Sequence, residues 1–525
     1  MTLTVLLAVL AVGHLISQRV RAPVPVILAI LGACVSWMPW LPREPLDPDV
    51  ILFLFLPPLL YADAFDASWT DFRRWLRPIL MLAVGLVLFT TVLVGIVAHA
   101  VLPQMPWPVC FILGAIVSPT DTVAVQAIIE RLHVPRRITA ILGGESLVND
   151  ATGLLGVQIG VAVLLSGAFQ AKTVVLQFAW IAGGGAGIGL AAGALFALIN
   201  RHVRDARVLF VLSLVAPYTA FLVAHQLDTS GVLAVVIAGF VVSWRIHTVP
   251  AVARVEMYAT WSMLIFVLNG FCFLLIGVEA PKLFLETKIA AGSEVLKAAL
   301  LVTAAVMGAR ILWVLPFAYI PLYFAKRLRE REGGYPSWKG VVLASWCGLR
   351  GVISLAAALS LPEFVDGSPF PARAAVLACA LIVILVTLIV QGLTLEPLVR
   401  MLGIRSDEDS TAEVFKARET VLAAGIARLD AYCSETSCPL SVHHWREAMA
   451  DELATLGEQD EEQRRLAKTR VEVSNEVRRE VARAEEEALL KLRDSGNIND
   501  KTYLDLQLEL DRQNMEGMPV SGGSS

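Results

Sequence analysis

The chain has 525 residues, of which 56% are hydrophobic and only 17% are charged. This composition excludes an ordinary soluble globular protein and predicts a polytopic membrane protein. Residues 1–400 hold 27 basic and 21 acidic residues, a net charge of +6, whereas residues 401–525 hold 16 and 26, a net charge of −10, so we expect a membrane part followed by a charged tail.

Apolar runs long enough to cross a bilayer as a helix, roughly 17 to 25 residues, recur throughout the first 400 residues. We therefore predict an all-α polytopic membrane protein with about 13 transmembrane helices. The runs lie near residues 3–17, 22–38, 50–66, 78–100, 108–129, 138–166, 173–199, 207–225, 230–246, 260–280, 297–325, 341–361 and 374–399.

Basic residues are concentrated in alternate loops between these runs. One set of loops holds 18 Lys and Arg residues and the other set holds 6. Because cytoplasmic loops carry the excess of Lys and Arg, the amino terminus is predicted to lie outside and the tail in the cytoplasm. The tail, residues 401–525, is expected to be a helical regulatory region with a disordered end.

Two of the runs contain residues that interrupt helices. The run 108–129 includes "VSPTDTVAV", in which Pro119 lacks a backbone donor, and the run 341–361 includes "SWCGLRGVISL", in which two glycines bracket Arg350. Non-helical backbone at membrane depth is tolerated where it lines a cavity. Runs five and twelve are equivalent if runs 1–6 and 8–13 are inverted repeats, an arrangement that places a transporter's site between two broken helices.

Ionisable side chains occur near the predicted middle of the membrane. At 1.5 Å per residue, Asp121 and Arg310 lie about 20 Å into their runs, Asp150 about 18 Å and Arg350 about 14 Å. Such residues are candidates for function by default. Glu145 and Arg310 are interpreted as a structural ion pair, which leaves two aspartates whose charge a mobile cation would neutralise.

The segment "GGESLVNDATGLL" places its polar side chains on two helix faces. Ser146 and Asp150 are four residues apart and share one face, while Glu145 and Asn149 share the neighbouring face. Carboxylate, hydroxyl and carbonyl oxygens suit a hard cation such as Na⁺. We therefore expect Asp150 to bind either Na⁺ or a proton.

Other classes of function are weighed against the same residues. An ion channel would be expected to show a ring-forming filter, and an intramembrane aspartyl protease would need Asp121 and Asp150 as a dyad, but neither residue lies in a G-x-G-D setting. In the tail, zinc ligands at Cys433, Cys438, His443 and His444 are disfavoured, because their spacing matches no common site. No nucleic-acid partner is expected.

Four motifs in order, "FLPPLLYADAF", "SPTDTVAV", "GGESLVNDATGLL" and "CGLRGVISLAAALSLP", resemble the bacterial sodium/proton exchangers of the monovalent cation/proton antiporter superfamily, in the branch with an Asn-Asp pair. The resemblance covers roughly residues 1–400. It implies an antiporter and not an enzyme. The transported ions would be Na⁺ (or Li⁺) and H⁺, and no cofactor is expected. A K⁺/H⁺ antiporter of the same fold is the alternative.

The resemblance also assigns roles to residues. Asp150 matches the aspartate that carries the ion and the proton, Ser146, Thr120 and Asp121 match positions that help to coordinate the cation, and Asn149 implies electroneutral one-for-one exchange. Arg310 matches the partner of Glu145, and Arg350 matches an arginine opposite the broken helix. In this sequence Ala62 stands where several relatives carry an acid, and Asp63 is expected to point about 100° away from that position.

The resemblance further implies a homodimer in the lipid of the bacterial inner membrane. Each protomer would have a dimerisation part, roughly 1–100 and 207–325, and a core part, roughly 78–166 and 297–399, that moves like an elevator. The sequence leaves open the preferred cation, the direction of net flux and what the tail binds.

Overall fold

The protein is described from a computed structural model. It describes residues 2–20, 23–38, 48–121, 125–126, 129, 132, 134–166, 171–365, 368–404, 408–435 and 440–456, and scattered positions between 473 and 510. The chain divides into two compact units, Met1–Ser406 and Asp407–Ser525. Each unit is considered by itself.

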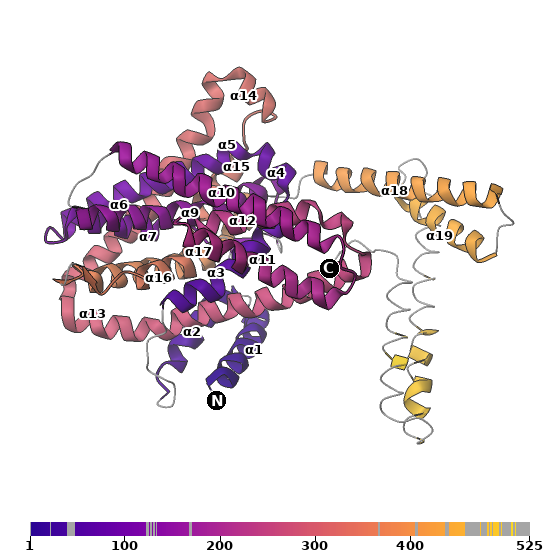
Figure 1. Cartoon of the computed structure of the whole chain (residues 1–525), viewed down its shortest axis with the longest axis horizontal. Coiled ribbons are helices and arrows are strands. Elements are labelled where there is room, and N and C mark those ends of the chain that lie inside the picture. Colours follow the sequence, from indigo (N-terminus) through magenta and orange to yellow (C-terminus); the bar gives the residue numbers. More distant parts are fainter. Residues whose placement is uncertain are drawn as a thin grey trace. The chain divides into compact units, whose positions relative to one another are not determined.

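The first unit is built almost entirely from helices (Figure 1). The first half of the unit contains α1 (Thr2–Val20), α2 (Val24–Val35), α3 (Pro48–Asp66), α4 (Trp69–Arg74), α5 (Leu76–Leu80), the π-helical turn η1 (Met81–Leu86), α6 (Val87–Val101), α7 (Trp107–Val117), α9 (Arg136–Ser166) and α10 (Ala171–Asn200). The second half contains α11 (Ala206–Gln226), α12 (Gly231–Trp244), η2 (Ile246–Thr248), α13 (Ala251–Phe324), α14 (Lys326–Arg331), α15 (Trp338–Trp346), α16 (Val352–Leu359) and α17 (Arg373–Leu402).

Apolar length identifies the helices that can cross a membrane. Among the described residues, seven helical segments are long and apolar enough to do so, and four shorter apolar helices accompany them. The strands described are β1 (Phe364–Val365) and β2 (Ser368–Pro369), a small antiparallel pair between α16 and α17. The prediction of an all-α polytopic membrane fold is confirmed, while the total of thirteen spans stays a prediction.

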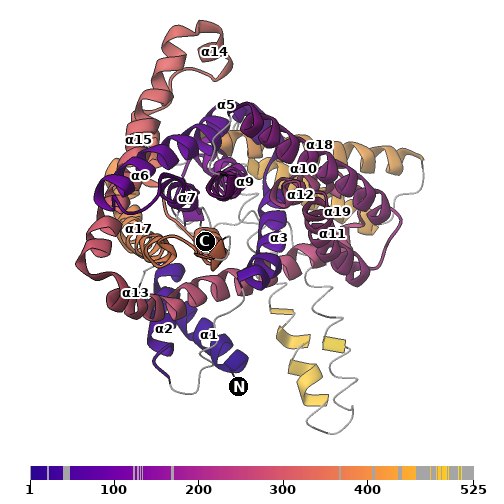
Figure 2. The same cartoon turned by 60° about the vertical axis from the view of Figure 1, so that its left-hand side comes forward.

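The predicted spans 260–280 and 297–325 correspond to two separate apolar segments, Ala251–Pro281 and Glu294–Phe324. The helical backbone continues between them, so both segments belong to α13, which has 74 residues. The intervening sequence is rich in Glu, Lys, Leu and Ala, which favour helix, so no strong breaker follows Pro281. Figure 2 shows that α13 runs along one edge of the unit and then turns.

Helix α9 lies between two hydrophobic clusters. Its residues Leu142 and Val157 belong to a cluster formed mainly with α2, α7, α13 and α17, and its residues Leu147 and Ala151 belong to a second cluster formed with α3, α11 and α12. Since α9 is apolar over much of its circumference, both sides of the helix can be buried. The polar segment Glu145–Asp150 is therefore held in the interior.

Both predicted helix interruptions are present. Helix α7 ends at Val117, and the backbone of Ser118–Asp121 is not helical. Helix α15 ends at Trp346, and α16 begins only at Val352. The end of α7 and the two helix ends at the second break leave backbone groups without partners inside their own helices, and the site described below uses these groups.

The second unit contains a helical hairpin, α18 (Glu408–Glu435) and α19 (Leu440–Leu456). Arg446 Nε donates to Asp430 Oδ1 at 2.5 Å, and this hydrogen bond lowers the pKa of the Asp430 carboxyl. Of the four tail residues weighed as zinc ligands, Cys438 lies outside the described residues.

Candidate ion-binding site

The two helix interruptions meet inside the first unit. The backbone N–H of Asp121, in the break after α7, donates to the carbonyl oxygen of Leu349, in the break before α16, at 2.8 Å. Gly351 packs directly against the Asp121 side chain, and a Cβ atom there would overlap the carboxylate. The crossing therefore depends on glycine, because any side chain at position 351 would separate the two segments.

A small cavity of about 40 Å³ lies at this crossing. Four of the predicted site residues line it together with residues of α3, α13 and α16. They are Thr120, Asp121, Ser146 and Asp150. A cavity of this size holds only a few water molecules or one partly hydrated ion.

Asp150 is the most informative residue of the cavity. It is only 4% exposed, yet within the described part of the chain its carboxylate has no hydrogen-bond or ion-pair partner. The carboxylates of Asp121 and Asp63 are close enough to interact with it electrostatically. A buried carboxylate without a fixed cation costs free energy unless a proton or a mobile cation neutralises it.

Glu145 and Arg310 lie together, each with its side chain 1% exposed. Arg310 donates from Nη1 to Oε1 at 2.5 Å and from Nη2 to Oε2 at 2.8 Å. Its Nε donates to the carbonyl oxygen of Ala344 on α15 at 2.9 Å. The pair thus connects α9 and α13 to the first half of the broken helix, and such two-point geometry is strong as well as directional.

Thr120 lies between this ion pair and the cavity. Its hydroxyl donates to Glu145 Oε1 at 2.9 Å and accepts from Asn149 Nδ2 at 2.9 Å. Asn149 Nδ2 also reaches the Thr120 carbonyl at 3.1 Å, and Ser146 Oγ donates to the same carbonyl at 3.3 Å. Asn149 itself does not line the cavity. Three side chains of α9 therefore fix the break after α7.

Arg350 is fully buried but faces helix ends instead of the cavity. Its Nε donates to the carbonyl oxygen of Val117, the last residue of α7, at 2.7 Å, and its Nη1 contacts the carbonyl oxygen of Gly348, just past α15. Its backbone N–H donates to Thr387 Oγ1 at 3.3 Å. Helix C-termini carry partial negative charge, so a guanidinium there is stabilising.

The structure corrects one sequence expectation and adds residues to the site. Asp63 was expected to point away, but it lines the cavity with Asp150, while Ala62 is buried in the second hydrophobic cluster. Because Ala62 packs into that cluster, α3 is rotated so that the next residue, Asp63, lies at the crossing. Asn269 of α13 and Ser354 of α16 also line the cavity. A polar residue in an apolar run was the only sequence signal for either.

A larger cavity of about 400 Å³ lies next to the first one. Asp63 lines both cavities, and the larger one also contains Asp66, Asp71 and Arg136. Arg136 Nε donates to Asp71 Oδ2 at 2.8 Å. Carboxylate side chains therefore line the route from this outer cavity, past Asp63, to the crossing. Their negative charge attracts cations and repels anions.

Comparison with known proteins gives a consistent result. Residues 4–401 match the family model described as "Sodium/hydrogen exchanger, transmembrane". A "Sodium, potassium, lithium and rubidium/H(+) antiporter" of Bacillus subtilis is 30% identical over 524 residues, covering 96% of this chain and 76% of that protein. An "Uncharacterized Na(+)/H(+) exchanger" of Mycobacterium bovis is 32% identical over 519 residues, covering 97% of this chain and 95% of that protein.

The fold also has solved relatives. The structure of the sodium proton antiporter MjNhaP1 from Methanocaldococcus jannaschii at pH 8 matches with a TM-score of 0.59 at 19% sequence identity. The match covers 77% of this chain and 98% of that one. At this level of identity the similarity concerns the fold alone.

Proposed function

The chain belongs to the sodium/hydrogen exchanger family of secondary transporters, and from that premise we propose that it exchanges Na⁺ or Li⁺ for H⁺ through one shared carboxylate, that of Asp150. The observation that carries this proposal is the burial of Asp150 in a small cavity with no fixed cation partner among the described residues. Both strong cations nearby are engaged elsewhere, Arg310 with Glu145 and Arg350 with backbone carbonyls.

The ligands for the cation would be oxygen atoms at the crossing. Asp150 and Asp121 supply carboxylates, and Ser146 and Thr120 supply hydroxyl or carbonyl oxygens at the cavity wall. Oxygen ligands of this kind suit hard alkali cations. Asn149 contributes indirectly, since its two hydrogen bonds to Thr120 hold that wall in place.

Exclusive occupancy by Na⁺ or H⁺ would produce exchange. Binding of Na⁺ or H⁺ removes one negative charge from the site, so the loaded site can cross the membrane interior more readily than the empty site, in which the Asp150 carboxylate is buried without a counter-ion. We propose an elevator-type movement in which the crossing moves relative to the rest of the unit. A homodimer would provide the fixed part.

The stoichiometry is proposed to be one Na⁺ for one H⁺. Asn149 stands beside Asp150 without charge, so one transported charge per half-cycle is expected. Proteoliposomes under an imposed membrane voltage provide the test. Exchange that neither generates nor responds to a voltage supports electroneutrality, and a voltage-dependent rate refutes it.

The preferred cation is proposed from the chemistry of the site and from the relatives. Na⁺ and Li⁺ are the first expectation, and K⁺ is the alternative because the name of the Bacillus subtilis relative includes potassium. Proton flux in vesicles across a series of Li⁺, Na⁺, K⁺ and Rb⁺ ranks them. If Na⁺ and H⁺ share Asp150, the apparent KM for Na⁺ should rise by up to about tenfold for each pH unit below the competition point.

The orientation is proposed from the basic loops. Arg136 and Asp71 at the outer cavity lie next to loops of the arginine-rich set, so this cavity would open to the cytoplasm of a bacterial inner membrane, with the amino terminus outside. Labelling of single cysteines introduced at position 71 from one side of sealed vesicles tests this assignment.

The decisive experiment replaces Asp150 by Asn in purified protein. Asn keeps the size of the side chain but can neither take up a proton nor balance a cation, so Na⁺-dependent proton flux in proteoliposomes should be lost. The thermal unfolding temperature should not fall, because the substitution removes a buried charge without a partner. Retained exchange in this variant would refute the assignment.

A further inference from the structure

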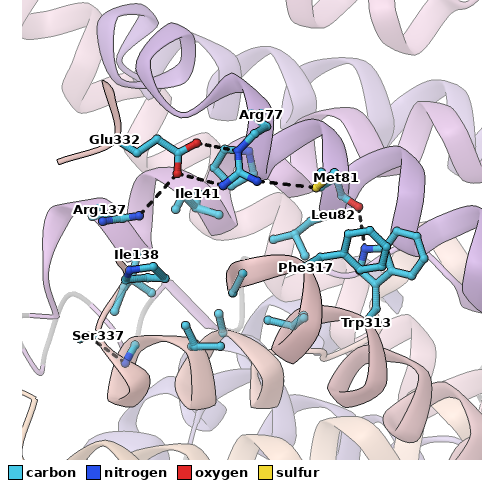
Figure 3. A pocket seen from close by; sticks show the side chains of 17 residues that line it. Arg77, Met81, Leu82, Arg137, Ile138, Ile141, Trp313, Phe317, Glu332 and Ser337 are labelled. Atoms are coloured by element: carbon cyan, nitrogen blue, oxygen red, sulfur yellow. Dashed lines mark hydrogen bonds and ion pairs between the residues drawn. The ribbon is translucent and has the colours of Figure 1, made fainter. Parts of the chain in front are cut away.

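A second cavity, of about 110 Å³, lies among α5, η1, α9, α13 and α15 and shares no lining residue with the cavity at the crossing (Figure 3). Most of its wall is apolar. The apolar part includes Met81, Leu82, Ile138, Ile141, Trp313 and Phe317. Trp313 Nε1 donates to the carbonyl oxygen of Met81 in the π-helical turn at 3.0 Å, and its ring stacks on Phe317 with centroids 4.0 Å apart. An apolar cavity of this kind suits an alkyl chain.

One end of this cavity is charged. Figure 3 shows Arg77, Arg137 and Glu332 gathered there, away from Trp313 and Phe317. Arg77 donates to Glu332 from Nε at 2.6 Å and from Nη2 at 2.9 Å. Arg137 lies 3.9 Å from the same carboxylate and over the Trp75 ring at 4.4 Å. Two guanidinium groups therefore gather around one carboxylate at this end of the cavity.

The segments that adjoin Arg77 and Glu332 in the sequence are basic as well. Arg73 and Arg74 end α4, and Lys326, Arg327 and Arg329 belong to the short helix α14. These residues are in the loop set predicted to face the cytoplasm, where the membrane leaflet carries anionic lipid. Basic clusters at this level attract anionic headgroups.

We infer that this cavity binds an anionic phospholipid of the cytoplasmic leaflet. The phosphate would lie on Arg137 and Arg77, and one acyl chain would lie along the apolar wall toward Trp313. Two complementary features in one cavity, an end with two arginine side chains and an apolar wall beside it, suit an amphipathic anion better than a zwitterionic lipid or a free inorganic anion.

Occupancy would act on the ion site through shared elements. The cavity is lined by Ala344, whose carbonyl oxygen accepts the Arg310 Nε hydrogen bond, and by Ile141, which is one helical turn before Glu145 on α9. A bound chain therefore supports both sides of the Glu145–Arg310 pair. We expect the lipid to change the exchange rate, a consequence that rests on the function proposed above, whereas the binding itself does not.

Quenching of Trp313 fluorescence by brominated acyl chains tests binding. The purified protein is placed in neutral phosphatidylcholine containing a small fraction of either brominated phosphatidylglycerol or brominated phosphatidylcholine, and the signal of a Trp313→Phe variant is subtracted. We expect saturable quenching by the anionic lipid only. Equal quenching by both lipids would show a merely lipid-exposed tryptophan and would overturn the proposal, as would the absence of quenching.

Further variants separate this site from general attraction. Arg137→Gln should weaken the binding of phosphatidylglycerol by about fivefold, the effect of one basic residue near the headgroup, and Glu332→Gln should strengthen it. Ala318→Phe should fill the cavity and abolish saturation. The matched control is Arg74→Gln, which removes a neighbouring charge that does not line the cavity. An equal loss in Arg74→Gln would overturn the proposal.

A second measurement covers variants that fold poorly. Native mass spectrometry of the detergent-solubilised protein counts retained phosphatidylglycerol molecules without any tryptophan substitution. One molecule fewer in Ala318→Phe than in the unmodified chain supports the site, and an unchanged count refutes it. Retained binding together with absent exchange would reject the proposed transport function and leave the lipid site intact.

Discussion

The backbone N–H of Asp121 donates to the carbonyl oxygen of Leu349 at 2.8 Å, so the two interrupted helices are joined by main-chain hydrogen bonding as well as by side chains. The joint leaves no room for a side chain at Gly351, where a Cβ would overlap the Asp121 carboxylate. The shape of the cavity therefore depends on glycine at this position as much as on the polar groups around it.

Gly351→Ala tests the closeness of this crossing. The added methyl group should displace Asp121, destabilise the protein by about 1–3 kcal/mol, as overpacking does elsewhere, and reduce exchange strongly. Gly308→Ala is the matched control, because a Cβ at Gly308 on α13 would meet no atom within 4 Å. Thermal unfolding and proton flux are measured for both variants, and normal exchange in Gly351→Ala would contradict the described crossing.

The buried pair of Glu145 and Arg310 predicts a pronounced non-additivity. Arg310→Ala leaves the Glu145 carboxylate buried without its partner and should cost about 3–5 kcal/mol of stability. In a Glu145→Ala background the same substitution should cost much less, since no charge is left behind. Unfolding free energies of the four proteins in this cycle give the coupling, and additive effects would show that the pair does not matter for stability.

Thr120 offers a test of the link between the ion pair and the cavity. Thr120→Val keeps the shape of the side chain but removes the hydroxyl that donates to Glu145 and accepts from Asn149. We expect a loss of about 1–2 kcal/mol and a weaker apparent affinity for Na⁺. Thr120→Ser restores the hydroxyl and should restore affinity, and a Ser variant as impaired as Val would point to packing instead.

Much of the fold could be predicted from the sequence because the signals were local. Lipid requires long apolar runs, and breakers such as Pro119 and Gly351 show in the sequence where a helix must stop. The join between the runs 260–280 and 297–325 was missed, since length rules describe a single span and give no information on whether helix continues between two spans.

The site could be predicted where two polar residues lie four positions apart on one helix. Ser146 and Asp150 share a face of α9 and line the cavity together, as their spacing indicates. The position of Asp63 was not predictable, because the rotation of α3 is set by burial of Ala62 against a distant cluster. Likewise, nothing local places Arg350 on the carbonyl oxygen of Val117.

The tail should not respond to pH through its resolved ion pair. Arg446 lowers the pKa of Asp430 below its ordinary value of 3.8, so the contribution of this pair is present above that value and is lost only as pH falls through the lowered pKa. Both side chains are exposed, which makes the effect small. Arg446→Gln should leave the pH profile of exchange unchanged over roughly pH 6 to 9, and a shifted profile would implicate the hairpin.

Asp63 is expected to guide cations to the crossing without being essential. It lines the cavity with Asp150 and also the outer cavity, so its charge attracts Na⁺ along the route, while the shared carboxylate remains in Asp63→Asn. A loss of about 1 kcal/mol of attraction corresponds to about a fivefold higher apparent KM for Na⁺, with the maximal rate largely retained.

Asp66→Asn is the matched control for Asp63→Asn. Asp66 lines only the outer cavity and is more exposed, and salt screens its charge. Na⁺ titrations of proton flux at constant ionic strength distinguish the two variants. Complete loss of exchange in Asp63→Asn would instead make Asp63 part of the transported site, because a guiding charge alone cannot abolish turnover at saturating Na⁺.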